Sequence, residues 1–515
     1  MDQKAQKISK QIWNYKMIKI VVLASVENFP WFTKPDVIPY IESCWRALDS
    51  KEFSVEILNV DAMSLTELTP RLLSAEKLVI TCVNYKICKI IEYVREVLRL
   101  KLNLIIYVHN MASIAFWPFR YFGTSELFMQ SDVFITASQN DRKTIESVFE
   151  GPTVHVIPFF SDIKNPSASK LHLTRPKNFV YVGRISPQNN LHSLILAYAL
   201  LKRRQVNQLP GLIFFGKEDH LGSPHMNLRN DNYLQFLHKL CENLNIQNQV
   251  FFKGHVDHES IDSFLQEKSN LIISPSLHSD ENFGMAVLKG LLAGNRVLIS
   301  NWGGHSDFKM YFNDQVTLMP VTHSEYGPAL GADTLADYAE KCLQGDEKSL
   351  SFKIDSYYLK PYFINEQKNA ISHKTTPAPL KFTKLANKIY DSKIDYTTSS
   401  TQIFSGFDDP LYLELSKNYI GQEGVEPLAN ESALYYAVPW MDYDAGVFKI
   451  TDPHKGEIQI PNDPSSQKKY SVYFNSELVV LVAKEICEKL HRNAFIYMTD
   501  SGQLTIRSNV KSYLA

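Results

Sequence analysis

The clearest indication of the fold is the stretch Phe179-Val180-Tyr181-Val182-Gly183-Arg184-Ile185-Ser186-Pro187, which leads directly into Asn190–Arg204. Its aromatic and β-branched residues favour a buried strand, and the residues that follow have the apolar spacing of a helix. The glycine at the end of the strand lets a ligand approach the backbone. An arginine before a helix N-terminus adds a cation to the positive end of the helix dipole, a combination that suits a diphosphate.

The same alternation of strands and helices extends in both directions from this stretch and predicts an α/β protein with parallel sheets. In the second half of the core, the expected strands are Asn178–Gly183, Gly211–Gly216, Gln249–Lys253, Leu271–Ser274, Arg296–Ser300 and Val316–Met319. In the first half they are Ile18–Ala24, Ser54–Val60, Lys77–Val83, Leu102–His109, Asp132–Ala137 and Val154–Phe159. We therefore expect two tandem Rossmann-like, doubly wound domains that face each other across a cleft.

Breaks in this pattern suggest three units. A polar linker at 161–167 separates a first domain, residues 1–165, from a second domain, residues 166–392. Beyond about Ile389 the pattern changes, and residues 393–515 are expected to form an α+β extension. Within this extension, Glu477–Leu490 has the spacing of an amphipathic helix and Phe495–Arg507 that of a hairpin.

Composition narrows the class of protein. A chain of 515 residues and 59.0 kDa suits two or three domains. The 54 Lys and Arg against 55 Asp and Glu give 54 − 55 = −1, so no overall positive field attracts nucleic acid. Six scattered cysteines without a CxxC pair indicate buried thiols in a reducing, cytoplasmic compartment. A basic segment with Ile8, Ile12 and Trp13 leaves peripheral contact with the cytoplasmic membrane face open, although a frayed polar terminus is the simpler interpretation.

A second motif in the later half of the core carries a carboxylate. The strand Leu271–Ser274 breaks at Pro275, and the loop that follows contains Glu281, Phe283 and Gly284 before a helix at Ala286–Ala293. A carboxylate accepts hydrogen bonds from sugar hydroxyls, and the amides that open a helix hold phosphate or hydroxyl oxygens.

Together these motifs resemble those of a known family. Residues 178–307 closely resemble the donor domain of GT-B-fold retaining glycosyltransferases of the group-1 type, which have a glutamate-x7-glutamate motif. The first domain is similar to the acceptor domain in its strand alternation and in His109 after a buried strand. The matching segments occur in the family's order: Val182–Pro187, Phe214–Gly216, Phe251–Val256 and Pro275–Asp307.

The resemblance implies roles for individual residues. Glu281 corresponds to the first motif glutamate, which contacts the donor sugar, and Arg184 to the arginine that neutralises the donor diphosphate. His109 corresponds to a histidine that contacts the sugar and positions reacting groups, although a strand-end histidine bonded to backbone is the competing interpretation. The other residues expected at the donor site are Gly183, Asn189, Gly216, His255, Val256, Asn282, Phe283, Gly284, Met285 and Lys289.

Two positions depart from the family pattern. The second motif glutamate, which binds ribose hydroxyls, is replaced by Lys289, and a lysine for the diphosphate is replaced by Asn189. The loss of one charge-assisted contact weakens binding by about 1.5–3 kcal/mol. If Lys289 turned towards the phosphates, it would restore the missing charge.

The sequence therefore predicts a retaining hexosyltransferase-type glycosyltransferase of polysaccharide biosynthesis. It would move a sugar from a UDP- or GDP-sugar to a glycan, lipid-linked or protein acceptor, without a cofactor or a metal ion. The alternative is a catalytically degenerate protein of the same fold that serves as a binding or scaffolding subunit, with the extension as an oligomer or partner contact. Asp442-Tyr443-Asp444 is interpreted as a surface turn rather than a metal site.

Overall fold

The computed structural model describes the two-domain core and separate strands of the C-terminal region. Its described residues are 17–25, 34–109, 123–160, 169–173, 175–219, 233–266, 269–278, 281–324, 327–344, 348–352, 356–373, 377–390, 414–421, 447–452, 456–461, 470–474, 478–483, 494–498 and 504–508. Asp442-Tyr443-Asp444 lies outside them.

The first domain is a parallel six-stranded sheet in the order β2-β1-β3-β4-β5-β6. Its strands are β1 (Ile18–Ala24), β2 (Phe53–Asn59), β3 (Lys77–Ile80), β4 (Asn103–Tyr107), β5 (Val133–Thr136) and β6 (Thr153–Val156). Its helices are α2 (Lys34–Arg46), α3 (Leu65–Ser74), α4 (Tyr85–Glu92) and α6 (Gln139–Val148), with short turns at η1 (Val60–Ala62), η2 (Tyr93–Val97) and η3 (Thr124–Leu127). β1 pairs with both β2 and β3, and its residues Ile20 to Leu23 are completely buried, because helices cover both faces of the sheet.

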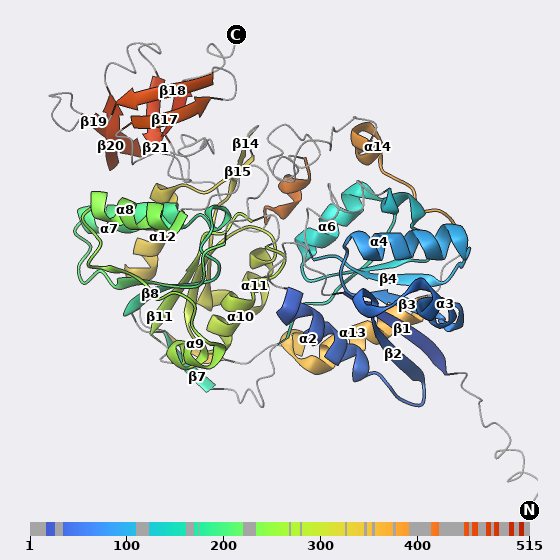
Figure 1. Ribbon diagram of the computed structural model, residues 1–515. Coiled ribbons are helices and arrows are strands. Elements are labelled where there is room, and N and C mark those ends of the chain that lie inside the picture. The colour runs from blue at the N-terminus through green and yellow to red at the C-terminus, as the bar shows by residue number, and fades with distance from the viewer. Residues whose placement is uncertain are drawn as a thin grey trace, which may run out of the picture.

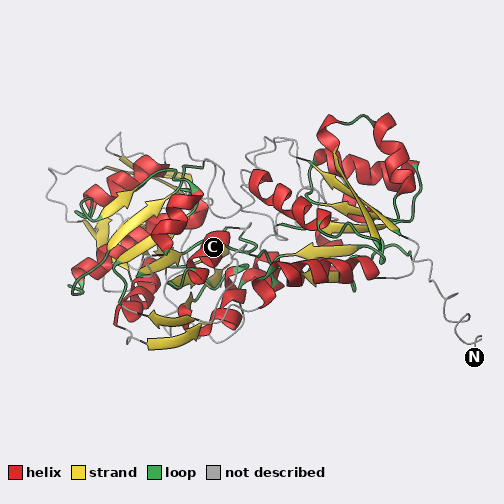
Figure 2. Cartoon of the chain, turned by 90° about the horizontal axis from the view of Figure 1, so that it is seen from below, coloured by secondary structure: helices red, strands yellow, loops and turns green. Residues whose placement is uncertain are grey.

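The second domain repeats this design with the order β10-β9-β8-β11-β12-β13 (Figures 1 and 2). Its strands are β8 (Asn178–Val182), β9 (Gly211–Phe215), β10 (Val250–Phe252), β11 (Asn270–Ser274), β12 (Arg296–Ser300) and β13 (Val316–Met319). Its helices are α7 (Leu191–Arg203), α8 (Tyr233–Asn243), α9 (His258–Leu265), α10 (Met285–Leu292), α11 (His305–Phe312) and α12 (Ala332–Gln344), with turns η4 (Pro187–Asn189) and η5 (Asn313–Gln315). Two small ribbons, β7 (Ser169–Leu173) with β16 (Lys348–Phe352) and β14 (Thr322–Ser324) with β15 (Gly327–Ala329), complete it.

The predicted fold class is confirmed. Each of the twelve expected strands is present, and each sheet is parallel throughout. Strand boundaries differ from the prediction by a few residues, because apolar runs continue into the loops beyond the last ladder bond.

After the second domain the chain returns to the first. Helices α13 (Lys360–Ser372) and α14 (Lys384–Tyr390) follow the turn η6 (Ser356–Tyr358) and lie beside α2 and α6 respectively (Figure 1). The amide of Gln367 donates to the Tyr107 hydroxyl at 3.1 Å, and the Leu380 N–H donates to the Phe128 carbonyl at 2.9 Å. Helices α13 and α14, which lie within the predicted second domain, thus pack on the first domain. The boundaries of the domains stay predictions.

The carboxyl edges of the two sheets meet at the domain junction. The N–H of Gln139, which opens α6 after β5, donates to Asp307 of α11 at 2.9 Å. The ring of Phe159, which follows β6, meets the ring of Phe283 at a centroid distance of 5.4 Å in an edge-to-face contact. Residues that follow strands of both sheets therefore lie close to one another, at the edge where ligands of α/β sheets bind.

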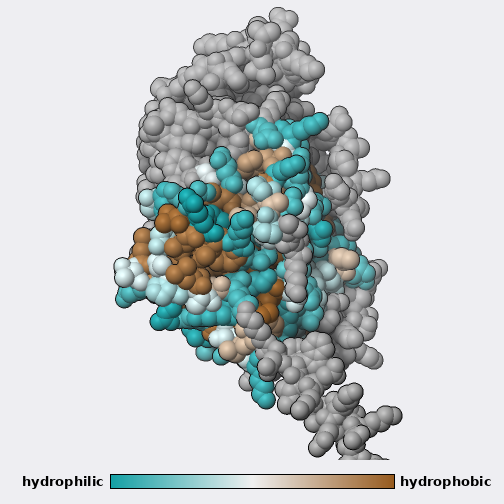
Figure 3. Space-filling view, turned by 90° about the vertical axis from the view of Figure 1, so that its right-hand side faces the viewer, coloured by the Kyte–Doolittle hydropathy of each residue, from teal (hydrophilic) through white to brown (hydrophobic). Residues whose placement is uncertain are grey.

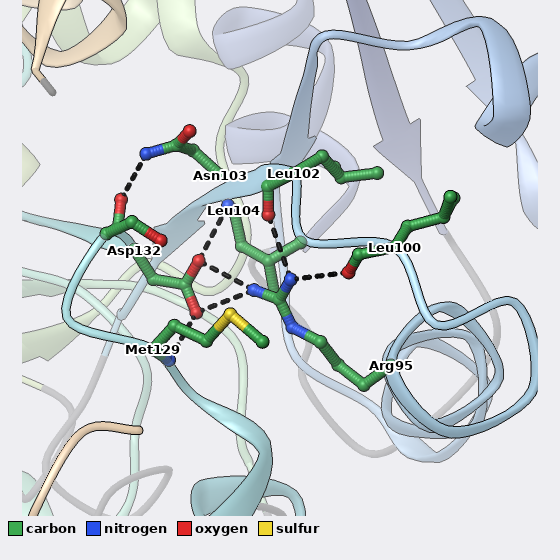
Figure 4. A network of polar contacts seen from close by, with 8 residues as sticks. Arg95, Leu100, Leu102, Asn103, Leu104, Met129 and Asp132 are labelled. Atoms are coloured by element: carbon green, nitrogen blue, oxygen red, sulfur yellow. Dashed lines mark hydrogen bonds and ion pairs between the residues drawn. The ribbon is translucent and has the colours of Figure 1, made fainter. Parts of the chain in front are cut away.

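A buried ion pair stabilises the opposite end of the first domain (Figure 4). Arg95 on η2 binds both carboxylate oxygens of Asp132 at 2.7 and 2.9 Å, and both side chains are almost fully buried. Arg95 also donates to the carbonyls of Leu100 and Leu102, while Asp132 accepts from the Leu104 N–H. This network joins η2 to the start of β4 and the approach to β5, so we assign it a structural role.

From residue 447 onwards, the described part of the C-terminal region consists of three antiparallel strand pairs. They are β17 (Val447–Asp452) with β18 (Gly456–Pro461), β19 (Tyr470–Phe474) with β20 (Leu478–Ala483), and β21 (Ala494–Met498) with β22 (Leu504–Ser508). The predicted hairpin at Phe495–Arg507 is confirmed. The predicted helix at Glu477–Leu490 is wrong over Leu478–Ala483, where valines favour the extended backbone of β20.

Among the described helices, none combines the length and the apolar character needed to cross a membrane.

Candidate functional site

Three loops of the second domain meet at the carboxyl ends of its strands β8, β9 and β10. The Gly183 N–H donates to the Phe215 carbonyl, and the Gly216 N–H donates to the Gly254 carbonyl, each at 2.9 Å. A Cβ atom on Gly216 would lie 1.7 Å from the Gly183 carbonyl oxygen, so only glycine permits this approach. The predicted Gly183 and Gly216 therefore lie side by side at this edge.

Arg184 follows directly and is not an isolated cation. Its guanidinium donates to the buried carboxylate of Asp219 at 2.8 Å, while its side chain keeps 29% of its surface exposed. Asp219 thus orients Arg184 and compensates its charge. The exposed part of the guanidinium is what remains for an anionic ligand.

His278 is the second side chain that contacts Arg184. Its Nε2 lies 3.3 Å from a guanidinium nitrogen of Arg184. Burial, together with the positive charge of Arg184, holds the pKa of His278 well below its usual value. The ring is therefore neutral, and Nε2 accepts a hydrogen bond from the guanidinium.

Glu281 lies in the loop before α10 and faces His305. The distance from Glu281 Oε1 to His305 Nε2 is 3.4 Å, and the two side chains are 18% and 1% exposed. Burial by itself raises the pKa of Glu281, but the interactions with His305, together with smaller ones from Ser276 and His278, outweigh it and lower this pKa to about 2. The carboxylate is ionised at neutral pH and can accept hydrogen bonds.

The hydrogen bonds around His305 determine where its protons lie. The Ser300 hydroxyl donates its proton to the Ser276 carbonyl at 2.6 Å, so towards His305 Nδ1, 3.1 Å away, it acts as an acceptor. Nδ1 therefore carries a proton. Nε2 faces the carboxylate of Glu281 at 3.4 Å, so His305 and Glu281 are paired below the loop.

The loop itself has the geometry expected of a backbone cradle. Phe283 is 3% exposed and packs against Phe159 and Phe308, which fixes the loop at the domain junction. Gly284 is the N-cap of α10 with a φ of 95° and provides no capping side chain. The helix amides from Met285 onwards thus begin four residues after Glu281 in the chain; the role expected of Asn282 to Met285 stays a prediction.

The two positions that depart from the family pattern are engaged inside the protein. The amide of Asn189 donates to the Arg184 carbonyl at 2.8 Å and accepts from the Ser276 hydroxyl at 3.1 Å. Lys289 lies 3.1 Å from Asp262 on α9. The suggestion that Lys289 turns towards the phosphates is not what the structure shows, because its ammonium group pairs with this carboxylate instead.

The remaining predicted residues lie around the site. His255 is exposed and Val256 half-buried, in the loop after β10. His109 Nε2 lies 2.7 Å from the Thr81 carbonyl, the arrangement of the competing interpretation, in which backbone satisfies the ring. The His109 ring also stacks on Phe159 at 6.5 Å, and Phe159 touches Phe283, so His109 lies two ring contacts away from the Glu281 loop.

A comparison with models of known protein families finds a match over the part of the chain that contains this site. Residues 162–316 match the family model described as glycosyl transferases group 1, a span that includes Arg184 and Glu281. The match supports a group-1 glycosyltransferase. No curated protein matches the chain.

Solved structures with a similar course of the chain share little sequence with it. They include Anabaena Alr3699/HepE in complex with UDP (16% identity, 69% of this chain and 95% of that chain, TM-score 0.43). A Rickettsia africae glycosyltransferase has 14% identity over 70% of this chain and 95% of that chain, with a TM-score of 0.43. The lipopolysaccharide outer core galactosyltransferase WaaB has 13% identity over 69% and 99%, with a TM-score of 0.44. Likenesses of this size carry no information on the ligand or the chemistry.

Sequence patterns did not identify three residues of the candidate site: Asp219, His278 and His305. Each owes its place to a contact between segments that are separate in the chain, with Arg184 for the first two and with Glu281 for the third. His278 and His305 lie within the matching segment 275–307, so their nearness in sequence to Glu281 was the available signal. No group of three or more His, Cys, Asp or Glu side chains among the described residues is placed to hold a metal ion.

A separate cavity of about 380 Å³ lies in the first domain between α3 and α4. Leu65 and Val97 at its rim are 53% and 64% exposed, and Figure 3 shows hydrophobic residues gathered on this side of the molecule. None of the predicted site residues lines it.

Proposed function

We propose that this chain transfers a sugar from a UDP- or GDP-sugar to a glycan, lipid-linked or protein acceptor. The observation that carries the proposal is the ionised Glu281 beside the opening of α10, within the segment that matches the group-1 family model. A fixed carboxylate close to the N-terminal amides of a helix suits a ligand that joins a hydroxyl-rich ring to a phosphate.

The residues of this site would act as follows. Glu281 accepts hydrogen bonds from donor-sugar hydroxyls, and the amides opening α10 with the exposed part of Arg184 stabilise the charge that develops on the leaving diphosphate. Phe283 and Phe159 close the junction and limit the access of water to the oxocarbenium-like centre. These groups supply positive charge where the leaving group departs, so we propose transfer without a metal ion. Retention of the anomeric configuration is proposed only from the resemblance of residues 178–307 to retaining glycosyltransferases.

The test is transfer and hydrolysis with a panel of UDP-, GDP- and ADP-sugars, followed by NMR assignment of the product anomer. Release of one nucleotide and a product with the donor's anomeric configuration are expected. Glu281→Gln, which keeps the size of the side chain and removes its charge, should lower kcat at least tenfold. Inversion of the configuration, or full activity of Glu281→Gln, would contradict the proposal.

Two contacts favour a second candidate, a binding or scaffolding subunit without transferase activity. Arg184 is already paired with Asp219, and Lys289, at the place of the ribose-binding glutamate, is paired with Asp262. A chain that shows neither nucleotide release nor thermal stabilisation with any donor would support this candidate and exclude the enzyme.

A further inference from the structure

Residues 414–421 contact both domains at the candidate site, although they come from the C-terminal part of the chain. The turn η7 (Lys417–Tyr419) lies within this segment, which we name the strap. Leu415, Ser416 and Tyr419 are completely buried. A short segment buried to this degree forms part of the packed structure around it.

On the second domain, the strap pairs with the loop after β12. The Gly303 N–H donates to the Tyr419 carbonyl at 2.7 Å, and Trp302 forms an antiparallel bridge with Ile420. The Gly421 N–H donates to the Asn301 carbonyl at 3.1 Å, and the Asn301 amide donates back to the Gly421 carbonyl at 2.8 Å. The strap is therefore joined to this loop by backbone as well as side-chain bonds.

On the first domain, the strap contacts the N-terminal end of α6. The Tyr419 hydroxyl donates to the buried carboxylate of Asp141. The amide of Asn140 donates to the Tyr419 carbonyl at 3.1 Å and to the Gly303 carbonyl at 2.9 Å. Asn140 thus joins the strap and the second domain at a single point.

The loop that the strap binds also supports Glu281. The Gly304 N–H donates to the Glu281 carbonyl at 2.7 Å. A Cβ on Gly303, whose φ is 55°, would lie 2.1 Å from the same carbonyl oxygen. Only the Gly303–Gly304 peptide separates the hydrogen bond at Tyr419 from the hydrogen bond at Glu281, so displacement of the strap moves the backbone behind the carboxylate.

We infer that the strap holds the two domains in one relative orientation and that Tyr419 and Asn140 are positioning residues for the Glu281 loop. This inference rests on the proposed function for its effect on catalysis. Its structural part, the fixed orientation of the domains, stands on the contacts alone. It gives part of the region 393–515 a role that the sequence left open.

The test measures the distance between the domains and transfer in the same variants. Spin labels are attached to cysteines introduced at the exposed Lys51 and Glu242, one in each domain, with Cys487 replaced by serine. Asn140→Asp places an acceptor opposite two carbonyl oxygens, and Gly421→Ala brings a Cβ to 2.0 Å from Asn301 Oδ1, so both variants should release the strap. Lys417→Gln is the matched control, because Lys417 is exposed and pairs with Glu414 inside the strap.

We expect one narrow distance distribution for the wild type and for Lys417→Gln, and a broader one for Asn140→Asp and Gly421→Ala. In these two variants kcat should fall about tenfold, while the Kd for UDP or GDP stays within twofold. Tyr419→Phe, which removes only the hydroxyl, is the milder variant should the others fail to fold, and it should broaden the distribution less. Unchanged distance distributions in all three variants would overturn the inference that the strap fixes the orientation of the domains. A broadened distribution with an unchanged kcat would overturn the positioning role of Tyr419 and Asn140. A wild type without transfer activity would contradict the proposed function and leave the distance measurement as the test of the strap.

Discussion

Nε2 of His305 lies 3.4 Å from Oε1 of Glu281, and His305 is 1% exposed beneath the loop that carries this carboxylate. Glu281 lies in the loop after β11, whereas His305 is the first residue of α11, the helix that follows β12. Their contact keeps a poorly solvated carboxylate ionised at the place where a sugar hydroxyl would need an acceptor. The contact between Glu281 and His305 therefore stabilises the domain and also keeps the carboxylate of the candidate site charged.

His305→Ala should destabilise the protein, because it leaves the carboxylate of Glu281 without its partner. Removing one member of a buried pair costs about 3–5 kcal/mol. The pKa of Glu281, about 2 against an ordinary value of 4.5, means that its contribution to stability is complete above pH 4.5 and is lost as the pH falls towards 2. Urea unfolding at pH 7 measures the effect. The double variant Glu281→Gln/His305→Ala is the control: it should regain part of the loss, and strictly additive effects would contradict the pair.

Asp219→Asn should strengthen the binding of nucleoside diphosphates. The substitution keeps the size of the side chain but removes the negative charge that compensates Arg184 at 2.8 Å. We expect the Kd of UDP or GDP to fall about threefold to tenfold, by calorimetry. Arg184→Met should raise the same Kd at least tenfold, because a charge-assisted contact is lost. Asp257→Asn, at an exposed helix cap, is the matched control, and weaker binding by Asp219→Asn would count against the role of Arg184.

Lys289→Glu alone should not restore ribose binding. The new carboxylate would face Asp262, which now pairs with Lys289 at 3.1 Å, and the two would repel each other. Lys289→Glu/Asp262→Asn removes this repulsion. We expect the double variant to prefer UDP over 2′-deoxy-UDP more strongly than the wild type does. Equal preference in the wild type, the single variant and the double variant would show that Lys289 does not lie next to the ribose.

Asp307→Asn should change how stability depends on pH. Burial raises the pKa of Asp307 to about 6, from an ordinary value of 3.8, although the Gln139 N–H donates to it. The folded protein therefore holds a proton that the unfolded chain releases, so this residue's contribution is present below pH 3.8 and is lost as the pH rises to 6. As the pH rises from 3.8 to 6, the Tm of the wild type should fall relative to the Tm of Asp307→Asn. Asp314→Asn, at an exposed position just after the same helix, is the control, and its Tm should depend on pH as that of the wild type does. If the Tm of Asp307→Asn also ran parallel to that of the wild type, the assignment to Asp307 would be refuted.

Arg95→Met should lower stability without affecting the site. It leaves Asp132 buried without its cation, at a cost of about 3–5 kcal/mol. Lys89→Met breaks an exposed pair with Glu92 and should lower stability much less, because solvent screens this pair. Urea unfolding separates the two variants. A change of kcat in folded Arg95→Met would show that the network reaches the candidate site.

The strands and the sequence of motifs were predictable because they depend on local patterns. Ile18–Ala24 and Arg296–Ser300 are strands over the expected residues, since runs composed mainly of apolar residues fit a sheet that is buried on both faces. The helix expected over Glu477–Leu490 failed because spacing alone does not separate a helix from a strand rich in valine. There the cross-strand partner, β19, is present to pair with the extended chain.

Gly183, Arg184, Glu281 and Gly284 could be placed at the carboxyl edge of a parallel sheet from the sequence alone, because strand direction and residue order fix that edge. The charge state of the site could not be predicted from strand direction and residue order. Arg184 with Asp219, Glu281 with His305 and Lys289 with Asp262 are pairs between separate loops or helices, and electrostatic interactions depend on distances that only the folded chain defines. The strap shows the same division most plainly: nothing in the local pattern of 414–421 distinguishes it, and its place between the domains follows from long-range packing against α6 and the loop after β12.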